Sequence, residues 1–496
     1  MFTKITAFFM SMIMMLLSIF GISFKHDEGK TMELYRTNYA AKSGNEKTDE
    51  LKALYKKVAE RTPEIKVCDA KKPFADDDRI KAVYFDGEDY NGKPSQIFAY
   101  IGFPENADSS APVPAMVLVH GGAGHAYAEW VQYWVNNGYA AISVDGFAQH
   151  PEDGYYTGKN EQWTVNPESH PTINETLSDS DKPFTEQWFY HYVADVILSN
   201  NIMRADNRVN KDKIGVTGIS WGSMAVSTAM CYDSRFAFAI PVYGSGYLGE
   251  CTGAISSLIG NSSFADVWDA SNLLSEVKMP VLYINSDCDP FFSANCNTAS
   301  AAYTENGTLI YAQKFLHGQN DGAYEPEILR FANEQTGMGE GNIKITEVSF
   351  NGKRAVVSFD VPEDVCNIRA YVYYRDSELD YDGLELKKDW SRKKGIDLGN
   401  VANIKVPDGA KYFYISIQGK AGKIFDKDTV QATTGIYSAE MLQKDGVYAK
   451  VIDREKLEKN IEKTLKKDIE SGKVGGAQLL VNQFGERVYD GVFGMK

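Results

Sequence analysis

Short apolar runs recur through the middle of the chain and alternate with longer segments whose apolar residues have helical spacing. Runs of this kind predict buried parallel strands, and the segments between them predict helices. The predicted strands are 115–119, 140–144, 213–217, 236–243, 280–284 and 308–312, and the predicted helices are 129–136, 184–199, 224–230 and 325–334. This alternation predicts a doubly wound, mostly parallel sheet with a functional site at the carboxyl ends of its strands.

The pattern changes on either side of this region. Ile80–Phe85 and Ser95–Ile101 flank Asp-Gly and Asn-Gly pairs, which predicts antiparallel strands around turns. Residues 343–433 contain short alternating strands and no helical pattern, as expected of a β-sandwich. Asp453–Ser471 has the pattern of a charged amphipathic helix, and a hairpin-like pair of strands follows it.

These changes divide the chain into five parts. We expect a signal peptide or membrane anchor at 1–24, a polar segment with a helix at 25–74, a catalytic domain at 75–336, a β-sandwich at 343–433 and a partial α+β tail at 440–496. Lys4 precedes an uncharged apolar stretch that runs to about Phe24, which is typical of a secretory signal or an uncleaved anchor. The sequence therefore predicts a secreted protein or one anchored outside the cytoplasm. Residues 148–183 are polar and predict a long loop or cap.

Composition narrows the possible partners. The formal charge of −15 argues against nucleic acid as a partner and leaves membrane contact only to the N-terminal stretch. The six cysteines are scattered, without a C-x-x-C pair, so neither a disulfide scaffold nor a structural zinc site is expected. Cys288 and Cys296 could pair in an oxidising compartment, or both could be free buried thiols. We expect no cofactor and no metal.

Candidate chemistry centres on Gly218-Ile-Ser-Trp-Gly222, a G-x-S-x-G sequence between a predicted strand and a predicted helix. Strand, glycine-flanked serine and helix together describe the nucleophile elbow of an α/β-hydrolase, with Ser220 as nucleophile. The glycines suit a tight turn, which holds the serine in a strained backbone conformation.

The order of residues along the chain identifies partners for Ser220. In this fold the nucleophile is followed first by an acid and then by the histidine base. Of the seven histidines only His317 follows Ser220, and it lies just past a predicted strand. The acid is expected in the loop after the strand 280–284, where Asp289 is better placed and Asp287 is the alternative.

Acyl transfer also needs two N–H donors for the oxyanion of the tetrahedral intermediate. We expect one from the backbone of Trp221. The other should come from the loop His120-Gly-Gly-Ala-Gly124, with Gly122 as first choice and Ala123 as second. The ring of His120 is expected to pin this loop.

Several segments resemble bacterial acetyl xylan esterase-like α/β-hydrolases, relatives of the dienelactone hydrolase and prolyl oligopeptidase groups. They are VLVHGGAGHAYAEWVQYWVNNGYAAISVD, VTGISWGSMA, RFAFAIPVYGSG, VWDASNLLSEVKMPVLYINSDCDPFF and FLHGQNDGAYEPEILRFAN. The resemblance covers residues 75 to 335 and implies Ser220, Asp289 and His317 as the triad. Ser223 and the pair Asp287-Cys288 depart from the usual pattern, which puts the geometry of the acid loop in question.

The resemblance extends to the C-terminal parts. Residues 343–433 are similar to the β-domain that such esterases carry, and the tail GGAQLLVNQFGERVYDGVFG resembles the opening of a serine β-lactamase-like domain. That tail is expected to be a truncated domain without its own activity.

The resemblance implies a serine carboxylesterase that removes acetyl or other small acyl groups from cell-wall carbohydrate or small esters, and the N-terminal apolar stretch predicts that it is exported. Two alternatives stay open. One is a serine peptidase of the prolyl oligopeptidase kind, and the other is a non-catalytic surface protein that binds glycan.

Overall fold

The computed structural model describes residues 42–494, apart from 69–73, 75–76, 153–162, 175–176, 260–262, 314, 352, 379–380, 383–384, 387, 424–425, 444–475 and 484–485. The predicted N-terminal signal or anchor and the predicted helix 453–471 lie outside the described residues. Among the residues that are described, no helix combines the length and apolar content needed to cross a bilayer.

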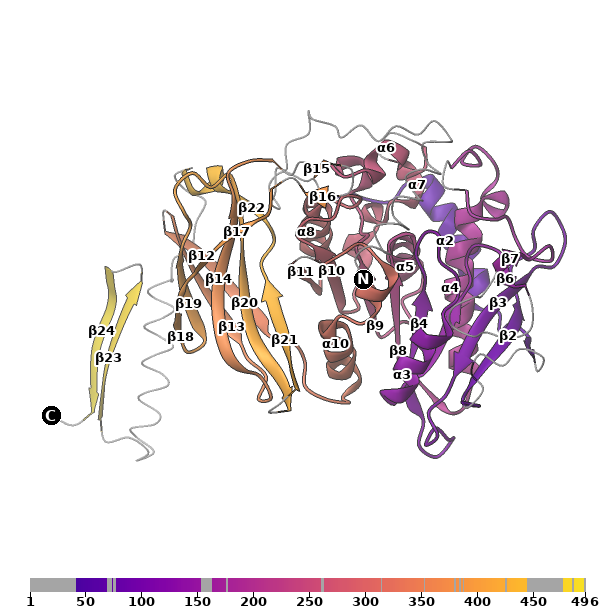
Figure 1. The fold of residues 1–496 in the computed structure, drawn as a ribbon, viewed down its shortest axis with the longest axis horizontal. Helices are drawn as coiled ribbons and strands as arrows, with labels where there is room; N and C mark the ends of the chain where they lie inside the picture. The colour runs from indigo at the N-terminus through magenta and orange to yellow at the C-terminus, as the bar shows by residue number, and fades with distance from the viewer. Residues whose placement is uncertain are drawn as a thin grey trace.

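A nine-stranded sheet forms the centre of the larger domain, with strand order β1-β2-β3-β5-β4-β8-β9-β10-β11 (Figure 1). The strands are β1 (Ile65–Val67), β2 (Ile80–Asp86), β3 (Gln96–Gly102), β4 (Val113–Val119), β5 (Ala140–Val144), β8 (Val209–Ile219), β9 (Phe238–Val242), β10 (Val281–Ser286) and β11 (Gly307–Ala312). Strands β5, β4, β8, β9, β10 and β11 run parallel, whereas β1, β2 and β3 pair antiparallel. The predicted doubly wound, mostly parallel sheet is therefore confirmed, and it is that of an α/β-hydrolase.

Helices cover both faces of this sheet. The main ones are α2 (Glu46–Ala59), α3 (Ala128–Asn136), α4 (Trp188–Ala205), α5 (Trp221–Tyr232), α8 (Ala294–Tyr303) and α10 (Pro326–Thr336). Strands β4, β5, β9 and β10 are buried along their whole length, as expected for parallel strands covered by helices.

The polar N-terminal segment is more closely integrated than the sequence suggested. Residues 46–59 form the predicted helix, α2, but Leu51 and Tyr55 are fully buried in the core of the large domain. Tyr55 donates a hydrogen bond to the carbonyl of Tyr190 on α4, and β1 pairs with the edge of the sheet. The described part of 25–74 thus belongs to the catalytic domain, because its apolar face needs α4 and α5 to cover it.

The segment after β5 contributes a small hairpin, formed by β6 (Gln149–Pro151) and β7 (Trp163–Val165). Trp163 stacks on His125, with ring centroids 4.2 Å apart. The hairpin therefore packs beside the loop that follows β4.

The second domain consists of two antiparallel sheets packed over a shared apolar core. One sheet holds β12 (Lys344–Asn351), β13 (Arg354–Asp360), β19 (Val401–Lys405) and β18 (Ile396–Leu398). The other holds β17 (Ser391–Lys394), β14 (Cys366–Arg375), β20 (Tyr412–Lys423), β21 (Asp426–Thr433) and β22 (Tyr437–Ser438). This is the predicted β-sandwich. Past it, β23 (Gly476–Gln483) and β24 (Glu486–Gly494) form the predicted hairpin of the tail.

The two domains pack directly against each other beside β11 and α10 (Figure 1). An aromatic cluster lies across the boundary and contains Ala294 and Tyr311 from one domain and Tyr373, Tyr412, Tyr414 and Ile436 from the other. Polar contacts join β11 to the sandwich, since the N–H of Tyr311 donates to Thr433 at 2.8 Å and Gln313 donates to Gln431 at 2.8 Å.

Candidate active site

Ser220 lies at the sharp turn between β8 and α5. Its backbone has φ 56° and ψ −114°, a strained conformation for a residue with a side chain. The N–H of Ser220 donates to the carbonyl of Val242 on β9, which ties the turn to the neighbouring strand.

Close packing at the glycines explains why the turn has this sequence. A Cβ on Gly218 would lie 2.3 Å from the carbonyl oxygen of Gly222, and one on Gly222 would lie 2.3 Å from the carbonyl oxygens of Val119 and His120. Any side chain at either position would force backbone atoms apart. The two glycines therefore let the helix α5 begin directly against the end of β4.

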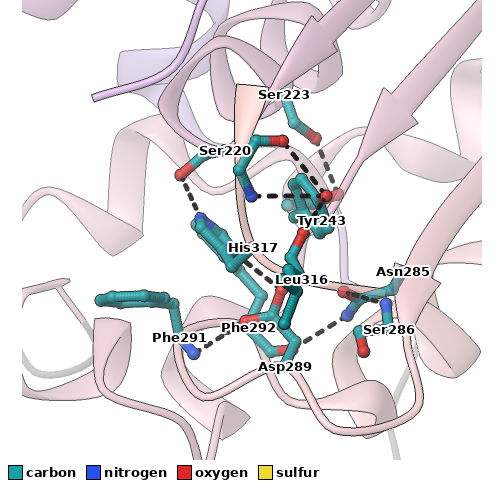
Figure 2. Close-up of polar contacts among 12 residues, drawn as sticks. Ser220, Ser223, Tyr243, Asn285, Ser286, Asp289, Phe291, Phe292, Leu316 and His317 are labelled. Carbon is teal, nitrogen blue, oxygen red and sulfur yellow. Dashed lines mark hydrogen bonds and ion pairs between the residues drawn. The ribbon is translucent and has the colours of Figure 1, made fainter. Parts of the chain in front are cut away.

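Ser220, His317 and Asp289 form a continuous hydrogen-bonded chain (Figure 2). The hydroxyl of Ser220 lies 2.9 Å from Nε2 of His317, and Nδ1 of His317 lies 2.7 Å from Oδ2 of Asp289. The carboxylate can only accept, which assigns the Nδ1–H tautomer to the imidazole and leaves Nε2 as acceptor for the serine proton. The structure thus brings together the three residues that the sequence singled out.

The carboxylate of Asp289 is fixed from two sides. Its second oxygen accepts hydrogen bonds from the N–H groups of Phe291 at 2.7 Å and Phe292 at 2.8 Å (Figure 2). The side chain is fully buried, so the surrounding donors rather than water stabilise it. A carboxylate held in this way orients the imidazole of His317.

Aromatic rings enclose His317. The rings of Tyr243 and Phe291 lie 4.4 and 4.6 Å from the imidazole between centroids, and Phe292 is stacked at 6.1 Å. The hydroxyl of Tyr243 donates to the carbonyl of Leu316, the residue before the histidine, at 2.5 Å (Figure 2). The side chain of His317 is only 11 % exposed, so the loop holds it in one place.

Asp287, the alternative acid, lies elsewhere. It is buried, and its Oδ2 accepts a hydrogen bond from the hydroxyl of Tyr414 at 2.8 Å. Tyr414 belongs to β20 of the second domain. Of the two candidate acids, only Asp289 is hydrogen-bonded to the imidazole of His317.

The loop after β4 is pinned by His120, as expected. Nδ1 of His120 donates to the carbonyl of Gly121 at 2.9 Å, and Nε2 accepts the N–H of Gly146 at 3.2 Å. Burial lowers the pKa of His120 to about 3, so the ring is neutral and structural. The same loop contains a turn in which the N–H of Gly124 donates to Gly121 and Ala123 has φ 54°.

The candidate oxyanion donors lie on either side of Ser220. Trp221 is the first residue of α5, and a Cβ on Gly121 would lie 3.2 Å from Cβ of Ser220, so the loop passes directly over the nucleophile. Gly122 is half-buried and Ala123 is exposed, so this part of the loop is accessible to a ligand.

Sequence reasoning missed the residues that hold the triad in place. Tyr243 and the N–H groups of Phe291 and Phe292 carry no pattern that distinguishes them before the fold is known.

No three His, Cys, Asp or Glu side chains within the described ranges converge in a way that could hold a metal ion. The six cysteines are all free thiols, and the buried Cys296 shares the hydroxyl of Ser293 with Cys251 rather than pairing with Cys288.

Comparisons with known proteins agree with this fold. Residues 97–312 match the model of the dienelactone hydrolase family, and the match supports a hydrolase fold for this part of the chain. The match begins in β3 and ends with β11. No curated protein sequence matches the chain.

Solved structures with similar folds include esterases and peptidases. An acetyl xylan esterase from Paenibacillus sp. R4 is 16% identical, with a TM-score of 0.47 over 60% of this chain and 97% of its own. Acetyl xylan esterase 1 from Thermoanaerobacterium sp. JW/SL YS485 is 15% identical, with a TM-score of 0.39 over 55% of this chain and 88% of its own. A puromycin-hydrolyzing peptidase of Mycobacterium tuberculosis is 18% identical, with a TM-score of 0.40 over 53% of this chain and 40% of its own. Similarity at this level does not distinguish ester from amide substrates.

Proposed function

We propose that this chain, whose residues 97–312 match the dienelactone hydrolase family, is a serine esterase that works through an acyl-enzyme. The observation that carries the proposal is the hydrogen-bonded chain from the Ser220 hydroxyl through His317 to the buried Asp289. A serine hydroxyl is a weak nucleophile until a positioned base takes its proton, and this geometry supplies that base and its orienting acid.

The reaction follows from the placement of these groups. Ser220 attacks the ester carbonyl while Nε2 of His317 takes the hydroxyl proton. The oxyanion is stabilised by the N–H groups of Trp221 and Gly122, with Ala123 as the alternative to Gly122. His317 then protonates the leaving alcohol, and water releases the acyl group from Ser220 by the same steps in reverse.

The finer substrate assignment is acetyl or another small acyl group, carried by cell-wall carbohydrate. It rests on the resemblance of residues 75 to 335 to acetyl xylan esterases. The proposed location outside the cytoplasm, secreted or anchored, rests on the apolar stretch up to about Phe24.

The first experiment measures hydrolysis of p-nitrophenyl acetate by the wild type and by Ser220→Ala. We expect the variant to lose at least about a thousandfold in kcat, because removing a triad member leaves only binding and the oxyanion donors. It should keep its melting temperature, since the alanine removes one oxygen. Undiminished turnover by a folded Ser220→Ala protein would contradict the mechanism.

A substrate panel separates the proposed esterase from the peptidase alternative. Acetylated xylan, acetylated monosaccharides, longer-chain esters and dipeptide amides are compared by kcat/KM. The proposal expects acetyl esters to exceed dipeptide amides. The reverse order would favour a peptidase, and binding of xylan without any turnover would favour a glycan-binding protein.

A further inference from the structure

The turn that carries Asp289 is held by the β-sandwich as well as by its own domain. Asp287, two residues before the acid, accepts a hydrogen bond from the Tyr414 hydroxyl at 2.8 Å. The backbone carbonyl of the same residue accepts from Nε1 of Trp390 at 2.7 Å. Both donors come from the sandwich, so one residue of the acid turn is held by its side chain and its backbone at once.

The two donors are themselves fixed in place. Tyr414 is fully buried, stacked on Tyr373 at 4.9 Å with nearly parallel rings, and Trp390 meets it edge to face at 5.1 Å. Burial and the neighbouring charge of Asp287 raise the pKa of Tyr414 well above its usual value, so its hydroxyl remains a donor. A buried donor with a rigid ring fixes the position of its acceptor.

The connection from Asp287 to the reacting atoms is short. Hydrogen bonds tie the segment from Ser286 to Phe292 together, because Asp289 accepts the N–H groups of Phe291 and Phe292 and the N–H of Cys288 donates to the hydroxyl of Ser286. A shift of Asp287 therefore moves Asp289 with it. Small displacements of catalytic groups have large effects on rate, because the reacting geometry is narrow.

We propose that Tyr414 and Trp390 are positioning residues for the catalytic acid and act through Asp287, so that the β-sandwich is a part of the catalytic unit. This inference rests on the proposed triad. It also gives a role to Asp287, which the triad leaves unused, and to the departure from the family pattern at Asp287-Cys288.

The main test replaces Tyr414 by Phe, which removes one hydroxyl and keeps the ring. We expect kcat for p-nitrophenyl acetate to fall about tenfold while KM changes less than about twofold, because the substrate site is untouched and only the acid is displaced. Tyr412→Phe is the matched control. Tyr412 is also buried on β20, but its hydroxyl donates to Glu378 of the same domain at 3.0 Å, so the kcat of this variant should stay at the wild-type value.

Variants of Asp287 test whether the effect passes through this residue. Asp287→Ala should lose as much kcat as Tyr414→Phe. The double variant should lose little more, because both changes remove the same hydrogen bond between Tyr414 and Asp287. Asp287→Asn keeps an oxygen that can accept the Tyr414 hydroxyl and should recover most of the activity. These variants also test the proposal if Tyr414→Phe fails to fold.

Three results would overturn the inference. They are an unchanged kcat in Tyr414→Phe, an equal loss in Tyr412→Phe and additive losses in the double variant. Failure of the proposed function looks different, because it appears as undiminished activity of Ser220→Ala. An inactive Ser220→Ala together with a fully active Tyr414→Phe would refute the positioning role alone.

Discussion

Backbone strain at Ser220 shows how single residues shape the site. A backbone φ of 56° is unfavourable for a residue that has a side chain, and it persists only where the surroundings enforce it. Here the enforcement comes from the hydrogen bond to Val242 and from the contacts around Gly218 and Gly222, where added atoms would overlap with backbone. The strained turn exposes the hydroxyl to His317 and places the first N–H groups of α5 where the proposed mechanism needs donors for an oxyanion.

A second feature at this scale is the set of neutral histidines in the interior. His191 lies on α4, is fully buried, stacks on His170 and donates Nε2–H to the carbonyl of Thr185 at 2.9 Å. Burial and the nearby His170 lower the pKa of His191 to about 3. In the unfolded chain the same group has a pKa of about 6.5.

This difference predicts a pH effect on stability. Below about pH 6.5 the unfolded state takes up a proton at His191 and the native state does not, so stability falls as the pH falls. Between about pH 7 and pH 5.5 this one group should remove about 1 kcal/mol from the free energy of unfolding. The free energy of unfolding, measured with urea at both pH values, should fall by about 1 kcal/mol less in His191→Phe than in the wild type. The same loss in both proteins would contradict the assignment.

At the scale of elements, α10 joins the two domains. It begins at Pro326, and the buried carboxylate of Glu327 in its first turn accepts the N–H of Gln431 on β21 at 2.7 Å. Burial, followed by the neighbouring Glu325, raises the pKa of Glu327 well above its usual value. The helix therefore presents a protonated carboxyl to an edge of the sandwich.

The sign of this pKa shift fixes a second prediction. A carboxyl that keeps its proton when folded and loses it when unfolded makes the native state less stable as the pH rises above the unfolded value. Glu327→Gln cannot ionise and retains an oxygen for the N–H of Gln431. Its free energy of unfolding should therefore fall less than that of the wild type between about pH 5.5 and pH 8. The exposed Glu347→Gln on β12 is the control, and an identical pH dependence in all three proteins would refute the assignment.

The elements themselves were largely predictable, because a buried strand is marked by a run of consecutive apolar residues. Val281–Ser286 and Gly307–Ala312 are examples. The histidine of the candidate triad could be chosen for a different reason, since only one histidine follows Ser220 in the chain. Contacts between distant segments were not predictable. The sequence of α2 is that of an ordinary polar helix, and nothing in it shows that its apolar face packs on α4.

At the scale of the whole molecule, the β-sandwich changes the picture of the active site. Its residues reach the turn of the catalytic acid through Tyr414, one of 29 tyrosines in the chain, in an alternating strand that any sandwich could contain. No sequence pattern marks this residue, because its role depends on how two domains dock. In the proposed mechanism, the active site is therefore assembled from the hydrolase domain and the sandwich together.

The proposed chemistry is tested most directly by trapping its covalent intermediate. The protein is mixed with p-nitrophenyl acetate, quenched in acid within the first turnovers, digested and analysed by mass spectrometry. We predict one acetyl group on the peptide that carries Ser220, absent in Ser220→Ala and strongly reduced in His317→Ala. Release of p-nitrophenol by the wild type with no acetyl group on Ser220, or with the group on another residue, would contradict it.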